Sequence, residues 1–130
     1  MKRFNKKNKK GFTLTELIMV IIILGLLAAV AVPKFFDLSG DANQAAEKGV
    51  VGGVRAGIQT YFAQNRAYPA SLDSVAVSTT CSATNVCFDT VLDQGGITED
   101  WSKNASGNYV GPDGGIYQYT QANNGSFLKL

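Results

Sequence analysis

Three kinds of residue are scarce in this chain of 130 residues, which has no histidine, two cysteines and three prolines. Without histidine it cannot build a His-based catalytic triad, a zinc site that depends on imidazole, or the usual acid–base catalyst near neutral pH. Its 14 glycines have no three-residue period, so it is not collagen-like. Charged residues reach only 17% and apolar residues 45%, which excludes a disordered polyelectrolyte. We therefore expect one folded domain, with or without an appendage.

Positive charge is concentrated at the start of the chain. Lys and Arg number 12 against 10 Asp and Glu, a net charge of +2, but six of the 12 lie within residues 1–10. The other residues therefore carry six positive and ten negative side chains, a net charge of −4. Binding of nucleic acid by the body of the protein is not expected from this balance.

A long apolar run follows the basic residues. Residues 17–32 carry no charge, and residues 12–33 carry only that of Glu16. About twenty helical residues span roughly 30 Å, the thickness of the hydrocarbon core of a bilayer. The run is therefore a candidate membrane span, and the basic residues before it predict a cytoplasmic N-terminus with residues 34–130 on the opposite side.

Glu16 helps to choose between interpretations of this span. A plain signal anchor explains the basic block and the apolar run, and a cleaved secretory signal fits the sequence Ala-Val-Ala at 29–31. Neither gains from a carboxylate, which costs about 2.5–3.5 kcal/mol at the centre of a membrane helix and less near its end. A cut after Gly11 would supply a partner, because the new amine of Phe12 would lie four residues before Glu16. That amine, in the same chain or in a staggered copy, would pair with the carboxylate.

Residues 10–17, with the sequence Lys-Gly-Phe-Thr-Leu-Thr-Glu-Leu, resemble the class III signal of type IV pilins and type II secretion pseudopilins. The resemblance implies that a prepilin peptidase cuts after Gly11 and N-methylates Phe12, which keeps its positive charge. It implies that an assembly ATPase and a platform protein extract subunits from the inner membrane into a helical filament. There Glu16 would cancel the Phe12 amine of a neighbouring subunit and set the stagger. The resemblance implies no catalysis and no cofactor.

Gly25 and Pro33 interrupt the apolar helix. Pro33 lacks an N–H, and a glycine lowers helix propensity by up to about 1 kcal/mol relative to alanine. The resemblance implies that the helix loosens between these positions in the filament. The alternative for Pro33 is that it only marks the exit from the membrane.

Residues 34–67 are predicted to continue the helix with one apolar face. That face recurs at spacings of three and four, at Ala42, Ala46, Val50, Val54, Ile58 and Tyr61. The charged side chains lie mostly off it, at Asp41, Glu47, Lys48 and Arg55. Gly49, Gly53 and Gly57 share another face at four-residue spacing. We expect this glycine face to allow close approach of backbone from the protein's own sheet or from a neighbouring subunit; the alternative is that the glycines bend the helix.

Residues 68–130 are predicted to form a small antiparallel sheet after Pro69 has ended the helix. Residues 70–77 suit a helical turn or a strand, and 78–85 form a polar loop. Strands are expected at 86–91, 108–110, 115–120 and 126–130, with a hairpin turn at 123–125. The predicted fold is α+β, with this sheet packed on the long N-terminal helix. Four aromatic residues are expected in its core and rim: Trp101, Tyr109, Tyr117 and Tyr119.

Cys81 and Cys87 are separated by five residues. In an oxidising compartment two such cysteines form a disulfide most simply, and free thiols are the alternative. A metal site of the usual Cys and His kind would need more ligands than the chain offers. Five acidic residues in loops are interpreted as solvated, with calcium binding as the alternative: Asp89, Asp93, Glu99, Asp100 and Asp113.

The sequence thus predicts a removed leader at 1–11, a membrane and filament-core helix at 12–33, its amphipathic continuation at 34–67, and a sheet region with a disulfide loop at 68–130. The predicted function is that of a structural subunit of a type IV pilus-like filament. It would lie in the inner membrane before assembly and in a pilus or pseudopilus afterwards. Two alternatives stay open. One is the major pseudopilin of a type II secretion system, and the other is a membrane-anchored or secreted monomeric binding domain, which leaves residues 11–16 unexplained.

Overall fold

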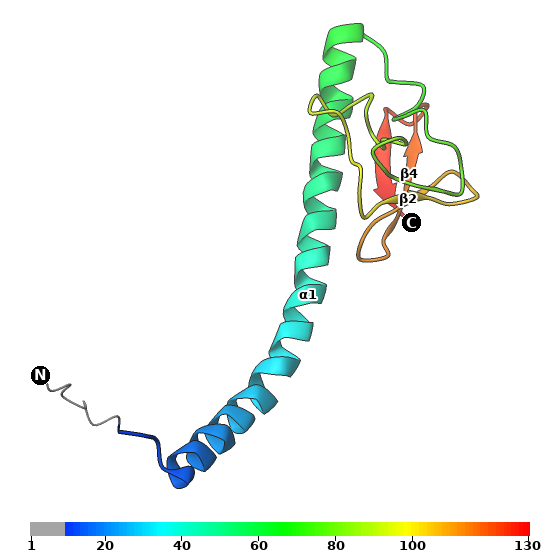
Figure 1. Cartoon of the computed structure of the whole chain (residues 1–130). Helices are drawn as coiled ribbons and strands as arrows, with labels where there is room; N and C mark the ends of the chain where they lie inside the picture. Colours follow the sequence, from blue (N-terminus) through cyan, green and yellow to red (C-terminus); the bar gives the residue numbers. More distant parts are fainter. Residues whose placement is uncertain (1–9) are drawn as a thin grey trace, which may run out of the picture. The chain divides into compact units, whose positions relative to one another are not determined.

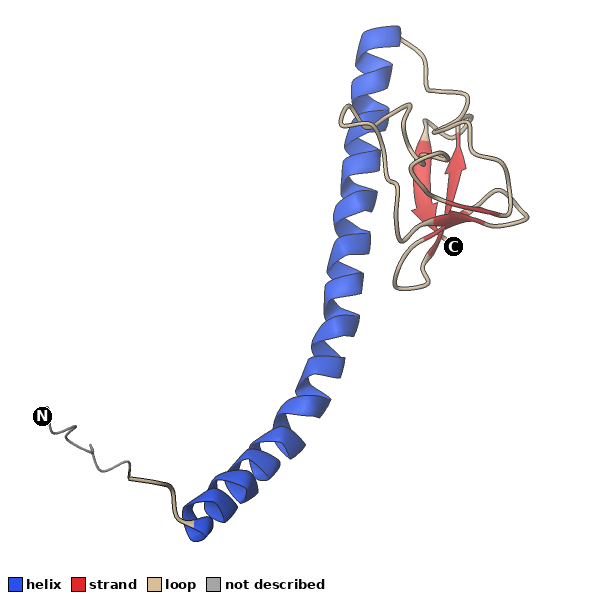
Figure 2. Cartoon of the chain, in the orientation of Figure 1, coloured by secondary structure: helices blue, strands red, loops and turns tan. Residues whose placement is uncertain are grey.

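The structure is a computed structural model that describes residues 10–130, so most of the predicted leader lies outside the described residues. One helix, α1 (Leu14–Asn65), precedes five strands (Figures 1 and 2). The strands are β1 (Thr79–Thr80), β2 (Ser102–Lys103), β3 (Tyr109–Val110), β4 (Ile116–Thr120) and β5 (Ser126–Lys129). The chain divides within α1 into two compact units, Met1–Leu38 and Ser39–Leu130, which are described separately.

The described part of the N-terminal unit, residues 10–38, is mainly the apolar part of α1. The helix is long and apolar enough to cross a membrane, and none of its apolar stretch is buried within the protein. Gly25 and Pro33 both lie inside α1, and its helical assignment runs through them without a break. The predicted loosening between them concerns the filament and stays a prediction.

The helix ends at Asn65, two residues earlier than predicted. Arg66 has a φ of 57°, in the left-handed region, and its backbone N–H donates to the carbonyl oxygen of Phe62 at 2.8 Å. This is a left-handed C-terminal cap, which satisfies a carbonyl that the last helical turn leaves free. The cap, rather than Pro69 alone, sets the end of α1.

The five strands form one antiparallel sheet in the order β1-β2-β3-β4-β5. Its longest ladder joins β4 to β5, with Tyr117 opposite Lys129 and Thr120 opposite Ser126. The turn predicted at 123–125 closes this hairpin, and Asn124 and Gly125 adopt the positive φ values, 55° and 62°, that such a turn requires. The α+β fold predicted from the sequence is confirmed.

The strand predicted at 86–91 is wrong, and two short strands were missed. Phe88 has a φ of 62°, and the N–H groups of Val91 and Leu92 both donate to its carbonyl oxygen, so this segment turns. Cys87 forms only an isolated bridge with Ile97. The segment at 70–77 is neither helix nor strand, and the predicted polar loop contains β1.

The core lies between one face of α1 and the sheet. Val54 and Ile58 of α1 are almost fully buried there, whereas Ala42 and Ala46 of the predicted apolar face are exposed. Phe88 is fully buried and its ring contacts three other core rings: Trp101, Tyr109 and Phe127. Trp101, Tyr109 and Tyr117 are buried as predicted, and Tyr119 lies at the rim, where its hydroxyl donates to the carbonyl oxygen of Pro69 at 2.6 Å.

Candidate assembly site at the start of the helix

Thr13 and Glu16 close the N-terminal end of α1 with reciprocal hydrogen bonds. The Thr13 hydroxyl accepts from the backbone N–H of Glu16 at 3.2 Å. In return, Glu16 Oε2 accepts from the backbone N–H and from the hydroxyl of Thr13, both at 3.1 Å. The carbonyl oxygen of Thr13 accepts the first helical bond, from Leu17. This is a capping box, which the spacing Thr-x-x-Glu signals in the sequence itself.

The capping box corrects one step of the sequence argument. Even a simple membrane anchor gains from Glu16, because the carboxylate caps the helix and its negative charge stabilises the positive N-terminal end of the helix dipole. The cap uses only Oε2. Within the described residues no hydrogen bond reaches Oε1, so one carboxylate oxygen has no partner in the chain's own cap.

Gly11 and Phe12 precede the cap in an exposed, non-helical segment. The side chain of Phe12 is 90% exposed, and nothing lies within 4 Å of the position that a Cβ on Gly11 would occupy. The peptide bond between them is therefore open to a protease. Phe12, Gly11 and Glu16 also line one shallow hollow, together with Lys10.

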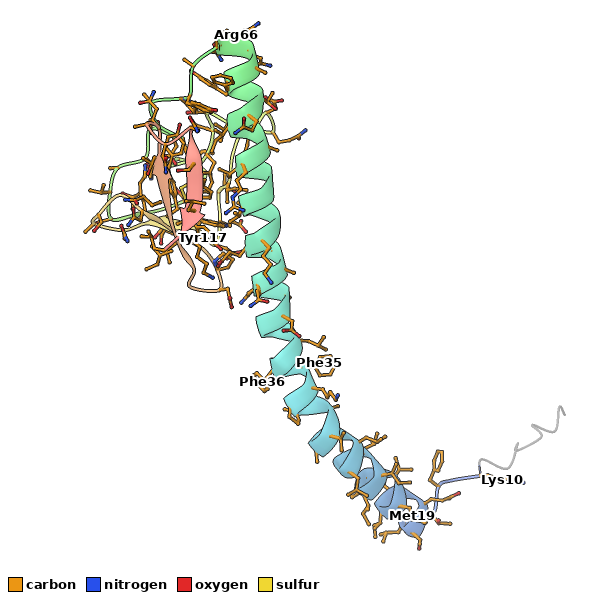
Figure 3. All side chains as sticks on the ribbon, turned by 180° about the vertical axis from the view of Figure 1, so that it is seen from behind. Lys10, Met19, Phe35, Phe36, Arg66 and Tyr117 are labelled. Carbon is orange, nitrogen blue, oxygen red and sulfur yellow. A yellow bond between two sulfur atoms is a disulfide. The ribbon has the colours of Figure 1, made fainter. Side chains whose placement is uncertain are left out.

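The large apolar side chains from Phe12 to Phe36 are all exposed. Figure 3 shows Met19, Phe35 and Phe36 turned away from the ribbon. The two phenylalanines are 70% and 76% exposed. A soluble monomer rarely exposes so large an apolar surface, which marks a membrane or protein contact.

The predicted glycine face divides into two parts. At Gly57 an added Cβ would collide with the carbonyl group of Val91, so this glycine is needed for contact with the protein's own loop rather than with its sheet. At Gly53 a Cβ would make an ordinary 3.8 Å contact with Leu92, and at Gly49 it would meet nothing. Beside these glycines lies a groove of about 460 Å³ between α1 and the loop at 91–97.

Glu47 is buried, contrary to the prediction from the sequence. The sequence places it among the charges that lie mostly off the apolar face of the helix, yet its side chain is buried, with the residue only 1% exposed. Its Oε1 accepts from the Tyr117 hydroxyl at 2.6 Å and lies 3.6 Å from Nζ of Lys129. Its Oε2 accepts from the backbone N–H groups of Asp113 and Gly115 at 2.9 and 3.3 Å. The carboxylate therefore fixes the turn between β3 and β4 to α1.

The electrostatics around Glu47 favour its charged form. Burial alone would raise the pKa of its carboxyl, but the hydrogen bonds from Tyr117, Asp113 and Gly115 and the charge of Lys129 outweigh burial, so the pKa is lowered. Burial and the hydrogen bond to Glu47 raise the pKa of the Tyr117 hydroxyl to about 12, so it stays a donor.

Glycine makes room for the Glu47 carboxylate in the turn. A Cβ on Gly111 or Gly115 would collide with the Glu47 side chain. The sequence signal was the pair of glycines that flanks Pro112-Asp113-Gly114, but nothing local connects this turn with a helical residue more than sixty positions earlier.

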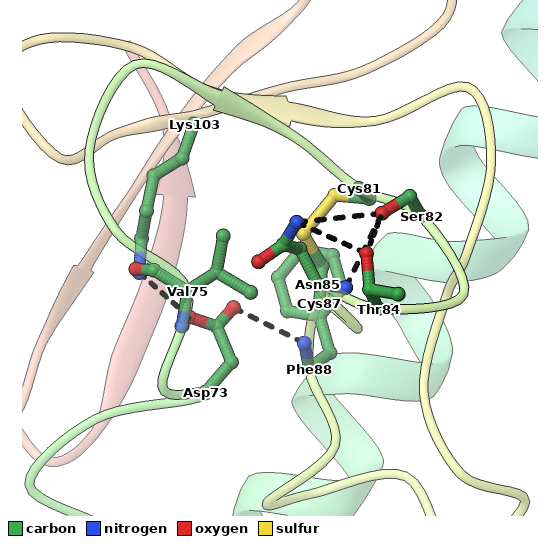
Figure 4. Close-up of a disulfide and its surroundings, with 9 residues drawn as sticks. All are labelled: Asp73, Val75, Cys81, Ser82, Thr84, Asn85, Cys87, Phe88 and Lys103. Carbon is green, nitrogen blue, oxygen red and sulfur yellow. Dashed lines mark hydrogen bonds and ion pairs between the residues drawn. A yellow bond between two sulfur atoms is a disulfide. The ribbon is translucent and has the colours of Figure 1, made fainter.

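Cys81 and Cys87 form the predicted disulfide, with their Cα atoms 5.5 Å apart (Figure 4). Next to it lies a buried ion pair, in which Nζ of Lys103 donates to Oδ1 of Asp73 at 2.6 Å. The other oxygen of Asp73 accepts from the backbone N–H of Phe88 at 3.2 Å. Together these bonds hold the irregular segment at 71–90 against β2. In residues 10–130 no three acidic or Cys side chains lie close enough together to hold a metal ion.

Comparison with known proteins points to the same end of the chain. Residues 6–32 match the family model for the prokaryotic N-terminal methylation motif. The chain is 45% identical over 60 residues to the type IV narrow pilus major component PilA5 of Thermus thermophilus. It is 35% identical over 66 residues to the type II secretion system core protein G of Pseudomonas aeruginosa, and 34% identical over 74 residues to the type IV major pilin protein PilE of Neisseria gonorrhoeae.

These matches cover 46%, 51% and 57% of this chain. They cover 52%, 46% and 44% of the relatives, so the chain spans about half the length of the curated relatives it matches. No solved structure matches the chain. The resemblance predicted from residues 10–17 is confirmed: the chain carries the N-terminal methylation motif and is similar to type IV pilins and to a type II secretion system core protein.

Proposed function

We propose that this protein is a prepilin, the structural subunit of a type IV pilus-like filament, and that it catalyses no reaction. The observation that carries the proposal is the start of α1. There an exposed Gly11–Phe12 peptide bond precedes a capped helix whose large apolar side chains are exposed. The methylation motif over the same residues supports it.

In this proposal, cleavage after Gly11 removes the basic leader and creates an amine on Phe12 that stays positive after methylation. Oε2 of Glu16 keeps its bonds to Thr13, because that cap needs no residue before Thr13. Oε1 then pairs with the Phe12 amine of a neighbouring subunit. A single buried polar pair of this kind is a well-attested way to fix register.

The apolar part of α1 would first lie in the inner membrane, with the leader in the cytoplasm. A prepilin peptidase would process the subunit, and an assembly ATPase and platform protein would move it into the filament, where helix contacts replace lipid contacts. Gly25 and Pro33 would let the helix loosen there. Gly49, where an added Cβ would meet nothing, and Gly53, where it would make only an ordinary contact with Leu92, would face a neighbouring subunit.

The first test is the mature N-terminus, measured by mass spectrometry of protein from a host with a prepilin peptidase. We expect methylated Phe12. A chain that begins at Val32 would establish cleavage by an ordinary signal peptidase, and a chain that retains its leader would overturn the proposal.

The second test separates the charge of Glu16 from its cap. Glu16→Gln keeps an acceptor for Thr13 and removes the charge, so we expect normal cleavage and a loss of filaments of about tenfold or more. Thr13→Ala is the matched control, because it weakens the cap by about 0.5–2 kcal/mol and keeps the charge. Normal filament yield from Glu16→Gln would remove the proposed pairing.

The second candidate function is that of a major pseudopilin, and it is favoured by the similarity to the type II secretion system core protein G. Expression in two hosts separates the candidates, one lacking its own major pilin and the other lacking its own major pseudopilin. We expect the chain to restore filaments in the first host. Restored secretion in the second host alone would favour the pseudopilin.

A further inference from the structure

We propose that a basic groove beside α1 receives the acidic segment 89–100 of a second copy of this chain. This inference rests on the proposed filament function and names a contact between its subunits. It uses the C-terminal unit only, and it is independent of the pairing between Glu16 and Phe12.

The basic groove lies along α1 where the helix meets β5, and its volume is about 350 Å³. Three of its lining side chains are cationic: Lys48, Arg55 and Lys129. Lys48 is exposed and donates only to the side-chain oxygen of Gln44, and Nε of Arg55 donates to the carbonyl oxygen of Phe127. The single acid in the groove, Glu47, is buried. The surface of the groove is therefore positively charged, and its cationic side chains can donate hydrogen bonds to a carboxylate.

The segment 89–100 has the opposite charge. All four of its acidic side chains are exposed: Asp89, Asp93, Glu99 and Asp100. No Lys or Arg occurs between Arg66 and Lys103. Among the residues that the structure describes, the only ion pairs are Lys103–Asp73 and Lys129–Glu47, so neither Lys48 nor any acid of the segment is paired within the chain.

The groove and the acidic segment lie on opposite sides of α1. Asp93 lines hollows on the glycine side of the helix, together with Gly57 and Thr60, whereas Arg55 lines the basic groove. Gly53, on the glycine side, and Arg55 are two residues apart and so lie about 160° apart around a helix of 3.6 residues per turn. When the acidic segment of one copy contacts the basic groove of the next, the groove of the first copy and the acidic segment of the second stay free to bind further copies. Such a head-to-tail contact repeats into a helical polymer, as a filament requires.

A cross-link between engineered cysteines tests this contact in assembled filaments. The two native cysteines are paired with each other, so Lys48→Cys combined with Asp93→Cys offers new thiols. We expect disulfide-linked dimers and longer ladders in non-reducing gels of oxidised filaments. The control combines Lys48→Cys with Ser106→Cys, which is exposed at the turn between β2 and β3, and should give no ladder. Filaments that form normally and cross-link no better than this control would overturn the inference.

Charge reversal tests whether the attraction between the basic groove and the acidic segment stabilises the filament. We expect Lys48→Glu and Asp93→Lys each to lower the yield of sheared filaments about tenfold or more, because like charges then face each other. The double variant should restore the yield to within about threefold of the unaltered chain. Arg66→Glu, at an exposed cation outside the groove, is the control and should keep its yield. Single variants with normal yield, or a double variant worse than either, would contradict the contact.

The two proposals fail in different ways. If the unaltered chain forms no filaments and carries no methylated Phe12, the proposed function is wrong. If it forms filaments and only the cross-link and the charge pair fail, the function stands and this contact does not.

Discussion

Replacing Glu47 with glutamine should destabilise the C-terminal unit without changing its shape. Glu47 accepts three hydrogen bonds, from the Tyr117 hydroxyl and from the N–H groups of Asp113 and Gly115. A glutamine can keep its oxygen on the two N–H groups and turn its amide toward Tyr117. It cannot keep the negative charge that strengthens all three bonds and attracts Lys129 at 3.6 Å.

The size of the effect follows from these bonds. A hydrogen bond to a charged group contributes about 1.5–3 kcal/mol and a neutral one about 0.5–1.5 kcal/mol, so loss of charge costs about 1 kcal/mol per bond. We allow for partial relaxation and expect a loss of about 2 kcal/mol in the free energy of unfolding. For a domain of this size that loss lowers Tm by about 8–16 °C. Glu47→Ala should cost more, about 3–5 kcal/mol, because it also removes the acceptor.

Tryptophan fluorescence measures this directly on the full chain in detergent micelles. Trp101 is the only tryptophan, it is 2% exposed, and its ring lies 5.8 Å from that of Tyr117. Its emission therefore reports unfolding of the sheet and not of the apolar helix. Glu99→Gln, at an exposed glutamate, is the matched control and should leave the unfolding midpoint unchanged. Equal midpoints for the two variants would refute the role given to Glu47.

The free energy of unfolding of the unaltered chain should fall as the pH is lowered below about 4.5. The pKa of Glu47 is lowered by folding, so its contribution is present above the unfolded value of 4.5 and is lost as pH falls through the folded value. Below pH 4.5 the unaltered chain should lose stability faster than Glu47→Gln, and the two denaturation midpoints should converge. A gap that stays constant from pH 7 to about pH 2 would contradict this linkage.

Two further changes test packing in the C-terminal unit. Gly57→Ala should lower the free energy of unfolding by about 1–3 kcal/mol, because the new Cβ would collide with the backbone of Val91. Gly52→Ala should raise it by about 0.5–1 kcal/mol, because nothing lies within 4 Å of the new Cβ and alanine favours the helix. Thermal unfolding of both variants measures the two changes, and changes of the same sign would contradict the prediction. Replacing both Cys81 and Cys87 by serine opens a short loop and should cost about 2 kcal/mol. A chemical denaturation curve that matches the oxidised parent would refute that estimate.

The N-terminal part of this protein could be predicted because its signals are local. The apolar run is continuous in sequence, and Glu16 lies about one helical turn after Phe12. The spacing of Thr13 and Glu16 is equally local, although the capping box was not predicted. The sheet was harder, because its order depends on partners far apart in sequence. The strand expected at 86–91 looked regular by composition, but the φ of Phe88 and the disulfide of Cys87 turn the chain there.

Glu47 shows why one buried charge escaped prediction. A glutamate in a helix is usually solvated, and its partners here lie 66 to 70 residues later, in a glycine turn and on β4. The strands β1 and β2 were not predicted for a related reason. Each has only two residues, too few to show an alternating pattern, and each is a strand only because it pairs with its neighbour in the sheet.

The two glutamates of α1 can be told apart by counting what their oxygens accept. Both oxygens of Glu47 are satisfied inside the chain, by Tyr117 on one and by two backbone N–H groups on the other, so removal of its charge should harm folding first. Glu16 has one oxygen in the cap and, within the described residues, no donor on the other, so removal of its charge should leave folding intact and harm what the chain binds. We therefore predict that the buried carboxylate of Glu47 builds the subunit, whereas the exposed carboxylate of Glu16, with one oxygen outside the cap, joins subunits. The opposite pattern, in which Glu16→Gln unfolds the protein and Glu47→Gln only blocks filaments, would show that hydrogen-bond satisfaction does not separate the two roles.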